Sequence, residues 1–186
     1  MKARATVHII IALGLALALV ALPGHKACAA TAKEIDAGVD AALDRFVKEV
    51  KEAKGYLDAA KGILVIPGVM QAGLVVGGEY GEGALRINGK TVDYYNIVAG
   101  SLGLQIGVQQ KDIILVFMDE DALMKFRSGE GWQAGVDGTV AIIKMGAEGS
   151  IDTAKMNQPI VGFVFGQKGL MAGATVEGAK FSKLKR

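Results

Sequence analysis

The pair Glu79 and Glu82 has the residue type and spacing closest to those of a catalytic site. Both stand in the segment Gly78–Gly83, and two carboxyl groups that flank a glycosidic bond can act as acid and base in its hydrolysis. The composition of the segment favours a strand, however, and side chains three positions apart on a strand point to opposite faces. We therefore expect this pair to perform no catalysis and to lie on a solvent-facing edge.

The segment Gly89-Lys90-Thr91 imitates the end of a phosphate-binding loop. A complete loop of that kind has another glycine five positions before its second glycine and is followed by a helix. Ala84 occupies that position, and Asn88-Gly89 is instead typical of a tight type I′ hairpin turn, whose two central residues need positive φ. No G-x-G-x-x-G motif occurs, so we expect no nucleotide cofactor and no other cofactor.

Imidazole and thiol groups, which most hydrolases and zinc sites employ, are confined to the first thirty residues. They are His8, His25 and Cys28, and the chain has no others. If this segment is removed, Ser-His-Asp catalysis, Cys-His catalysis and the usual zinc sites lose the side chains that they need. The sequence therefore predicts a protein that is not an enzyme, with no catalytic residue and no metal site.

The first thirty residues have the layout of a secretory signal peptide. Lys2 and Arg4 precede an uncharged apolar stretch, Val7–Leu22, and small residues follow it. The stretch is shorter than the roughly 20 residues that a membrane-spanning helix usually needs. We expect residues 1–30 to form a cleaved signal and the rest of the chain to be exported, to the periplasm or to another part of the envelope.

The small residues at the end of this segment predict the cleavage site. Ala27-Cys28-Ala29 has the A-x-A pattern, and the same pattern shifted by one residue is acceptable, so cleavage should follow Ala29 or Ala30. Lipidation of Cys28 is the alternative. It is less favoured, because bacterial lipoproteins carry leucine or a similar apolar residue three places before the cysteine, where this chain has His25.

Removal of the leader changes the charge balance. The leader holds three basic residues, Lys2, Arg4 and Lys26, of the 21 in the chain, and none of its 19 acidic residues. The remaining chain is left with a net charge near −1. A positive field over the whole molecule is the usual sign of nucleic-acid binding, so we expect no nucleic-acid partner.

A helix is predicted to begin at Thr31, because Thr31 and Glu34 have the spacing of a capping box. Gly55 is expected to end or bend this helix, and a second, short helix is expected over residues 56–61. Apolar residues recur along the first helix at spacings of three and four and form one stripe: Ile35, Val39, Leu43, Phe46, Val47 and Val50.

From Gly62 onward, short apolar runs alternate with glycine-rich breaks, which predicts strands. The runs are 63–66, 72–76, 113–118 and 160–165, and a short helix capped by Asp119 or Asp121 is expected over residues 119–128. Glycine makes up 26 of 186 residues, about twice the usual share of roughly 7%, and within strands it indicates close backbone approach, curvature or bulges. We predict an α+β fold in which one or two N-terminal amphipathic helices pack on a strongly curved antiparallel sheet, sandwich or partial barrel.

Three segments resemble the SYLF domain. They are AKGILVIPGVMQAGLVVGGEYGEGAL (60–85), GWQAGVDGTVAIIKMGAEG (131–149) and KGLMAGATVEG (168–178), and they occur in the same order as in secreted bacterial members of that family. The resemblance covers nearly all of residues 31–186 and implies a single domain that binds membrane lipid. Some fungal relatives also bind actin, but an exported protein would meet no cytoskeleton, so we do not expect actin binding here.

Two groups of basic residues are the candidates for contact with anionic lipid headgroups. One group lies on the predicted helices and comprises Lys33, Lys48, Lys51 and Lys54; the other lies at the C-terminus and comprises Lys180, Lys183, Lys185 and Arg186. The apolar stripe of the first helix could enter a bilayer interface, although such stripes more often cover a protein core. Trp132, Tyr94 and Tyr95 could contact a ligand, but core packing is the commoner role. The alternative function is a structural or partner-binding protein of the envelope.

Overall fold

The computed structural model describes residues 30–73, 76–102, 107–144, 157–169, 176 and 178–186. The predicted leader, except Ala30, therefore lies outside the described residues, and so does Cys28. Among the residues that are described, no helix has both the length and the apolar character needed to cross a membrane.

The first described helix, α2 (Ala32–Glu49), begins as the sequence predicts. The N–H of Glu34 donates to the hydroxyl of Thr31, and the carboxylate of Glu34 accepts the N–H of Thr31 at 2.7 Å, which completes the capping box. The prediction that Gly55 ends or bends the helix is wrong. The chain leaves α2 at Val50, whose backbone is extended while its side chain is buried in the core, and Gly55 lies inside the short helix α3 (Ala53–Ala59).

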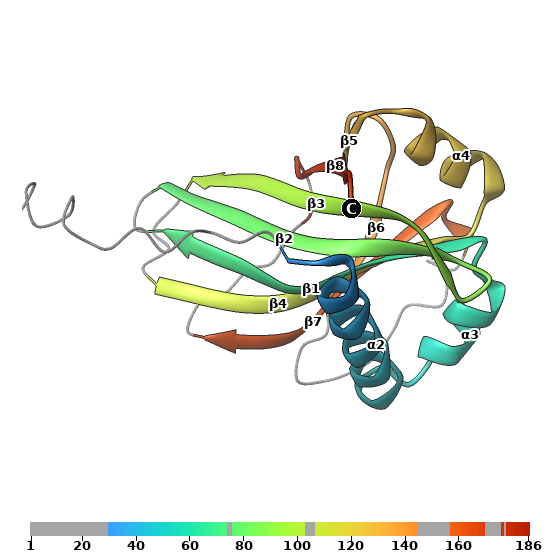
Figure 1. Cartoon of the computed structure of the whole chain (residues 1–186), viewed down its shortest axis with the longest axis horizontal. Helices are drawn as coiled ribbons and strands as arrows, with labels where there is room; N and C mark the ends of the chain where they lie inside the picture. Colours follow the sequence, from blue (N-terminus) through green and yellow to red (C-terminus); the bar gives the residue numbers. More distant parts are fainter. Residues whose placement is uncertain (1–29, 74–75, 103–106, 145–156, 170–175, 177) are drawn as a thin grey trace, which may run out of the picture.

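In the described part of the chain, eight strands form one sheet in the order β5-β8-β3-β2-β1-β4-β7-β6. Their bounds are β1 (Gly62–Gly73), β2 (Val76–Ile87), β3 (Lys90–Leu102), β4 (Gly107–Phe117), β5 (Gly131–Gln133), β6 (Ala141–Lys144), β7 (Ile160–Gly169) and β8 (Lys180–Leu184). The sheet curls into half of a barrel (Figure 1). The predicted α+β class and strong curvature are confirmed.

The sheet is mixed, not wholly antiparallel as the sequence suggested. β6 pairs with β7 in parallel, whereas the other strand pairs among the described residues are antiparallel. Residues 145–159 join these two strands, and a connection of about a dozen residues or more is what parallel neighbours require. No local sequence pattern distinguishes such an edge strand from an antiparallel one.

Local turn and cap signals were correct. Asn88 and Gly89 join β2 to β3 with φ angles of 51° and 74°, as a type I′ turn requires, and a strand rather than a helix follows them. Helix α4 (Glu120–Ser128) is capped by Asp119, whose side chain accepts the N–H of Ala122 at 2.9 Å.

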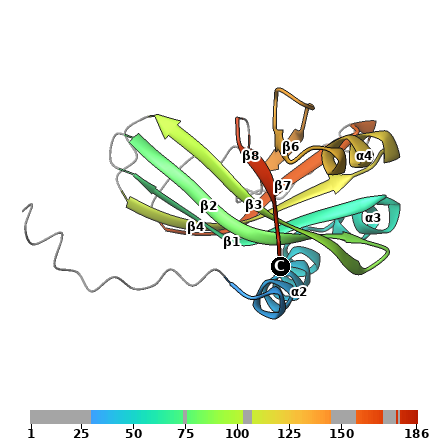
Figure 2. The same ribbon diagram turned by 45° about the horizontal axis from the view of Figure 1, so that its top comes forward.

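The two faces of the sheet carry separate cores. The outer face is covered by α2 and α3, and the inner, concave face by α4 and the chain around β5 (Figure 2). Curvature depends on close approach of β1 and β2: a Cβ on Gly83 would stand 1.9 Å from the carbonyl oxygen of Val65. The glycine at this position therefore permits the curl, as its place within a strand suggested.

Candidate functional site

Helix α2 crosses the outer face but covers only part of it. Near its start, Asp36 accepts the hydroxyl proton of Tyr94 on β3 at 3.0 Å. Near its end, Arg45 forms a 2.7 Å ion pair with Asp112 on β4. Strands β1 to β4 and β7 continue past the helix, and their far ends carry no helix (Figure 1).

Beyond α2, one row of cross-strand neighbours is apolar in the middle and basic at both ends. Because the members of an antiparallel pair share a face, all of them lie on the outer face. Val98, Tyr80 and Met70 form the middle of the row and are 49%, 49% and 46% exposed. The full row, from β8 to β7, is Lys180, Val98, Tyr80, Met70, Gln110 and Lys168.

The next positions toward the strand ends continue the same surface. Ala72 lies between Gly78 and Val108 in the strand register, and Val108 is 57% exposed. Val76, at the start of β2, is 67% exposed. We use the name apolar face for the six residues that make this surface: Met70, Ala72, Val76, Tyr80, Val98 and Val108.

Only positive charge borders the apolar face in the described part of these rows. Lys168 and Lys180 are both exposed, and neither forms an ion pair with the residues that the structure describes. The nearest carboxylate on this face, Glu82, is largely buried and already paired with Arg186 at 2.9 Å. An anionic, amphipathic surface is therefore the complement of this region.

The ring of Tyr80 is fixed on the apolar face by its hydroxyl group. The hydroxyl donates to Glu82 at 2.6 Å, and this hydrogen bond is the main reason why the pKa of Tyr80 is raised. Burial alone would raise the pKa of Glu82, but hydrogen bonds from Tyr80 and Arg186 outweigh burial and lower it. At neutral pH the phenol therefore stays protonated and its polar end stays satisfied, which leaves the ring free for apolar contact.

The inner face shows the reverse pattern at the same end of the sheet. Lys111 is fully buried, and its Nζ lies 2.7 Å from Oε1 of Glu79 and 3.3 Å from Oε1 of Gln71. The prediction that Glu79 lies on a solvent-facing edge is wrong, because this lysine draws its carboxylate to the inside; Glu82 is likewise mostly covered. Glu79 and Glu82 lie on opposite faces of the sheet, as their spacing on a strand predicted. The two carboxyl groups are therefore separated by the sheet.

The structure places the predicted basic residues in different surroundings. Lys180 borders the apolar face, whereas Lys183 pairs with Asp93 at 3.4 Å. Arg186 pairs with Glu82, and Lys185 is exposed beyond β8.

The predicted lysines of the helices are exposed: Lys33 at the start of α2, Lys48 near its end, Lys51 before α3 and Lys54 within α3. The apolar side of α2 faces the sheet, with Ile35, Val39 and Phe46 at most 3% exposed. Val47, which the predicted stripe included, is 37% exposed and faces away. The helix therefore covers a core, and α3 lies at the opposite end of the sheet from the free strand ends (Figure 1).

The aromatic candidates belong mainly to the inner core. Trp132 and Tyr95 are 3% and 1% exposed, and Trp132 packs edge-on against Phe126 of α4 at a centroid distance of 5.4 Å. Core packing, the commoner role, is confirmed for both residues. Tyr94 is held by Asp36 of α2.

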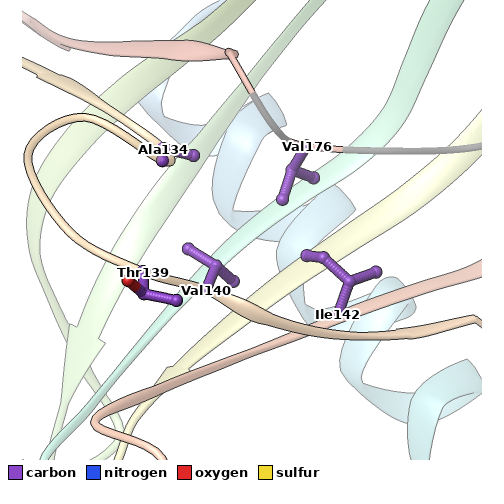
Figure 3. A pocket seen from close by; sticks show the side chains of 6 residues that line it. Ala134, Thr139, Val140, Ile142 and Val176 are labelled. Atoms are coloured by element: carbon purple, nitrogen blue, oxygen red, sulfur yellow. The ribbon is translucent and has the colours of Figure 1, made fainter.

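A small cavity lies on the other side of the molecule, near the turn after β5. Its volume is about 180 Å³, and side chains of Ala134, Thr139, Val140, Ile142 and Val176 surround it (Figure 3). Its described lining offers one hydroxyl, that of Thr139, and no charged group. The cavity is thus a poorer match to a charged headgroup than the apolar face with its two lysines.

Comparison with known proteins supports the resemblance seen in the sequence. A family model described as Ysc84, a Las17-binding protein actin regulator, matches residues 98–186. Residues 98–186 belong to the SYLF domain family. No curated protein matches the chain. The SYLF match runs from within β3 to the C-terminus and includes Lys168 and Lys180, while β1 and β2, which supply most of the apolar face, precede it.

Lys180 was among the predicted basic candidates, whereas Lys168 and all the residues of the apolar face were not. A signal was present in the alternation along β1 and β4. There, Gln71, Gln109 and Lys111 alternate with Met70 and Val108, and such alternation is usually taken to put the polar side in water. The structure inverts that assignment, because the curled sheet encloses the polar side and leaves the apolar side exposed.

Proposed function

We propose that the chain is a non-catalytic protein of the bacterial envelope that binds anionic phospholipid surfaces through the apolar face. The observation that carries the proposal is the row in which Val98, Tyr80 and Met70 stand exposed between Lys180 and Lys168. A contiguous exposed apolar surface on a protein of this size is a mark of binding. The SYLF family suggests lipid binding or actin-related binding in general.

Estimated magnitudes indicate that apolar contact dominates. Full burial of an exposed Val, Met or similar side chain contributes about 1.5–3 kcal/mol, so five large side chains that are roughly half exposed would supply about 5 kcal/mol together. Two lysines near an anionic surface add about 1 kcal/mol each. Binding should therefore weaken in high salt without disappearing, and it should be stronger on anionic than on neutral vesicles.

Export and localisation are part of the proposal. They rest on the signal-like segment of residues 1–30, with its basic start, apolar middle and A-x-A site. Exported protein meets envelope phospholipid and no actin, so within the two activities that the family suggests we favour lipid.

The second candidate function is docking of an envelope protein on the same apolar face. Exposed apolar surfaces of this kind also serve protein partners. The two functions differ in one measurable respect, because a protein interface would not follow the lipid composition of vesicles.

Charge reversal at the two lysines that border the apolar face tests whether this face is the one that contacts the vesicle. Exported protein carrying Lys168→Glu and Lys180→Glu should bind phosphatidylglycerol-containing vesicles at least about thirtyfold more weakly than the unmodified protein in low-salt co-sedimentation. Two lost lysine contacts of about 1 kcal/mol each amount to about that factor, and the glutamates add repulsion. The matched control carries Lys48→Glu and Lys54→Glu at the other end of the molecule, and its binding should change less than about twofold.

The reverse result would contradict the proposed face. If Lys48→Glu with Lys54→Glu weakened vesicle binding and Lys168→Glu with Lys180→Glu did not, the headgroup contact would lie on α2 and α3. Failure of the unmodified protein to bind either anionic or neutral vesicles would contradict the lipid function itself.

A further inference from the structure

Glu82 on β2 carries one oxygen that none of the described residues satisfies. Its side chain is 11% exposed, and Oε1 accepts the hydroxyl proton of Tyr80 at 2.6 Å and lies 2.9 Å from Nη2 of Arg186. The second oxygen, Oε2, is buried and accepts no hydrogen bond of good geometry. A buried carboxylate oxygen without a donor is costly, so a missing donor is expected here.

The main chain at Ala30 lies beside this carboxylate. Its backbone N–H is among the groups that lower the pKa of Glu82, and Ala30 packs against the outer core. The next residue, Thr31, opens the capping box of α2. Ala30 is therefore held against the folded domain, one residue before the N-cap of α2.

We propose that the leader is removed after Ala29 and that the α-ammonium group created on Ala30 binds Oε2 of Glu82. The inference rests on the export that is part of the proposed function. Hydrolysis of the Ala29–Ala30 peptide bond by a signal peptidase consumes one water; Ala29 leaves with a carboxylate, and the nitrogen of Ala30 becomes –NH₃⁺. This group has three rotatable donors and a positive charge, where the intact chain offers one N–H in a fixed direction.

The geometry selects between the two cleavage sites that the sequence leaves open. Cleavage after Ala30 would discard the packing of Ala30 on the core. It would also place the new charge on the nitrogen of Thr31, which already donates to Oε2 of Glu34 at 2.7 Å. Cleavage after Ala29 keeps that hydrogen bond, keeps the packing, and supplies the donor that Glu82 lacks.

The charged groups around the proposed ammonium define its pH behaviour. Glu82 and the Tyr80 hydroxyl face it from β2, Arg186 from the end of the chain, and Glu34 lies one turn into α2. Pairing with Glu82 favours the charged amine in the folded state. The resulting stability is therefore complete below the ordinary titration range of an α-amine, at about pH 7.7–8.0, and is lost as the pH rises through and above that range.

Two measurements on the exported protein test the inference, and neither involves lipid. Intact mass should show a chain that begins at Ala30. At pH 8, the α-amine of this chain should react with acetic anhydride about fivefold more slowly than the amine of the Glu82→Gln variant, because pairing holds it protonated. Glu49→Gln, an exposed carboxylate at the far end of α2, is the matched control and should leave the rate unchanged.

The alternatives give different outcomes, and each would overturn the inference. A mature chain that begins at Thr31, or at a lipidated Cys28, excludes the proposed terminus. Equal acetylation rates in the unmodified protein and in Glu82→Gln would show that the amine does not bind Glu82. Because vesicle binding is measured separately, either failure leaves the proposed lipid function standing on its own test.

Discussion

Replacement of Lys111 by alanine should lower the free energy of unfolding by about 3–5 kcal/mol, because it leaves the carboxylate of Glu79 buried without its cation. Lys111 and Glu79 have side-chain exposures of 0% and 5% and an N–O distance of 2.7 Å. Urea unfolding of the exported protein, followed by circular dichroism, measures the change. Lys168→Ala is the matched control; this exposed lysine should change stability by no more than about 0.5 kcal/mol.

A double variant separates loss of the ion pair from loss of packing. Lys111→Met with Glu79→Leu removes both charges while keeping apolar bulk, and replacement of a buried pair in this way is often neutral or stabilising. We expect the double variant to be more stable than Lys111→Ala by at least about 2 kcal/mol. A double variant as unstable as Lys111→Ala would show that the charge pair is not the source of the loss.

Met70→Glu should reduce binding to phosphatidylglycerol vesicles by about tenfold or more. The substitution puts a carboxylate in the centre of the apolar face, where it loses apolar contact and meets anionic headgroups. Met70 is 46% exposed in the free protein, so its replacement should leave the fold intact. Vesicle co-sedimentation measures binding, and circular dichroism confirms that the variant is folded.

Met124→Glu provides the matched control for Met70→Glu. Met124 is also an exposed methionine, at 56%, but it lies on α4, which covers the inner face. Vesicle binding by the Met124→Glu variant should stay within about twofold of that of the unmodified protein, because no apolar contact with lipid is lost at this position. Equal losses in both variants would mean that binding depends on net charge alone.

The elements that the sequence predicted well depend on a few neighbouring residues. The capping box of Thr31 and Glu34, the type I′ turn at Asn88-Gly89 and the Asp119 cap each form within four residues. Local hydrogen bonds of that kind follow from residue type and spacing alone, so they could be predicted without knowledge of the tertiary fold.

The candidate site could not be predicted in the same way, because it depends on strand register and sheet curvature. Lys168 and Lys180 are brought to one row by pairing with Gln110 and Val98, which lie far from them in the chain. Burial of Lys111 beside Glu79 likewise requires that β2 and β4 flank β1 and that both side chains point to the concave face of the sheet. Periodicity shows that a strand has two different sides, but the fold decides which side meets water.

A fluorescent probe at position 70 tests the central claim most directly. An environment-sensitive fluorophore attached to Met70→Cys, in a Cys28→Ser background, should shift to shorter wavelength when phosphatidylglycerol vesicles are added to the exported protein, while the same probe at Met124→Cys should not respond. This is the result expected if the apolar face enters the bilayer surface. Bound protein in which position 70 keeps its aqueous spectrum, or in which position 124 shifts instead, would contradict the account.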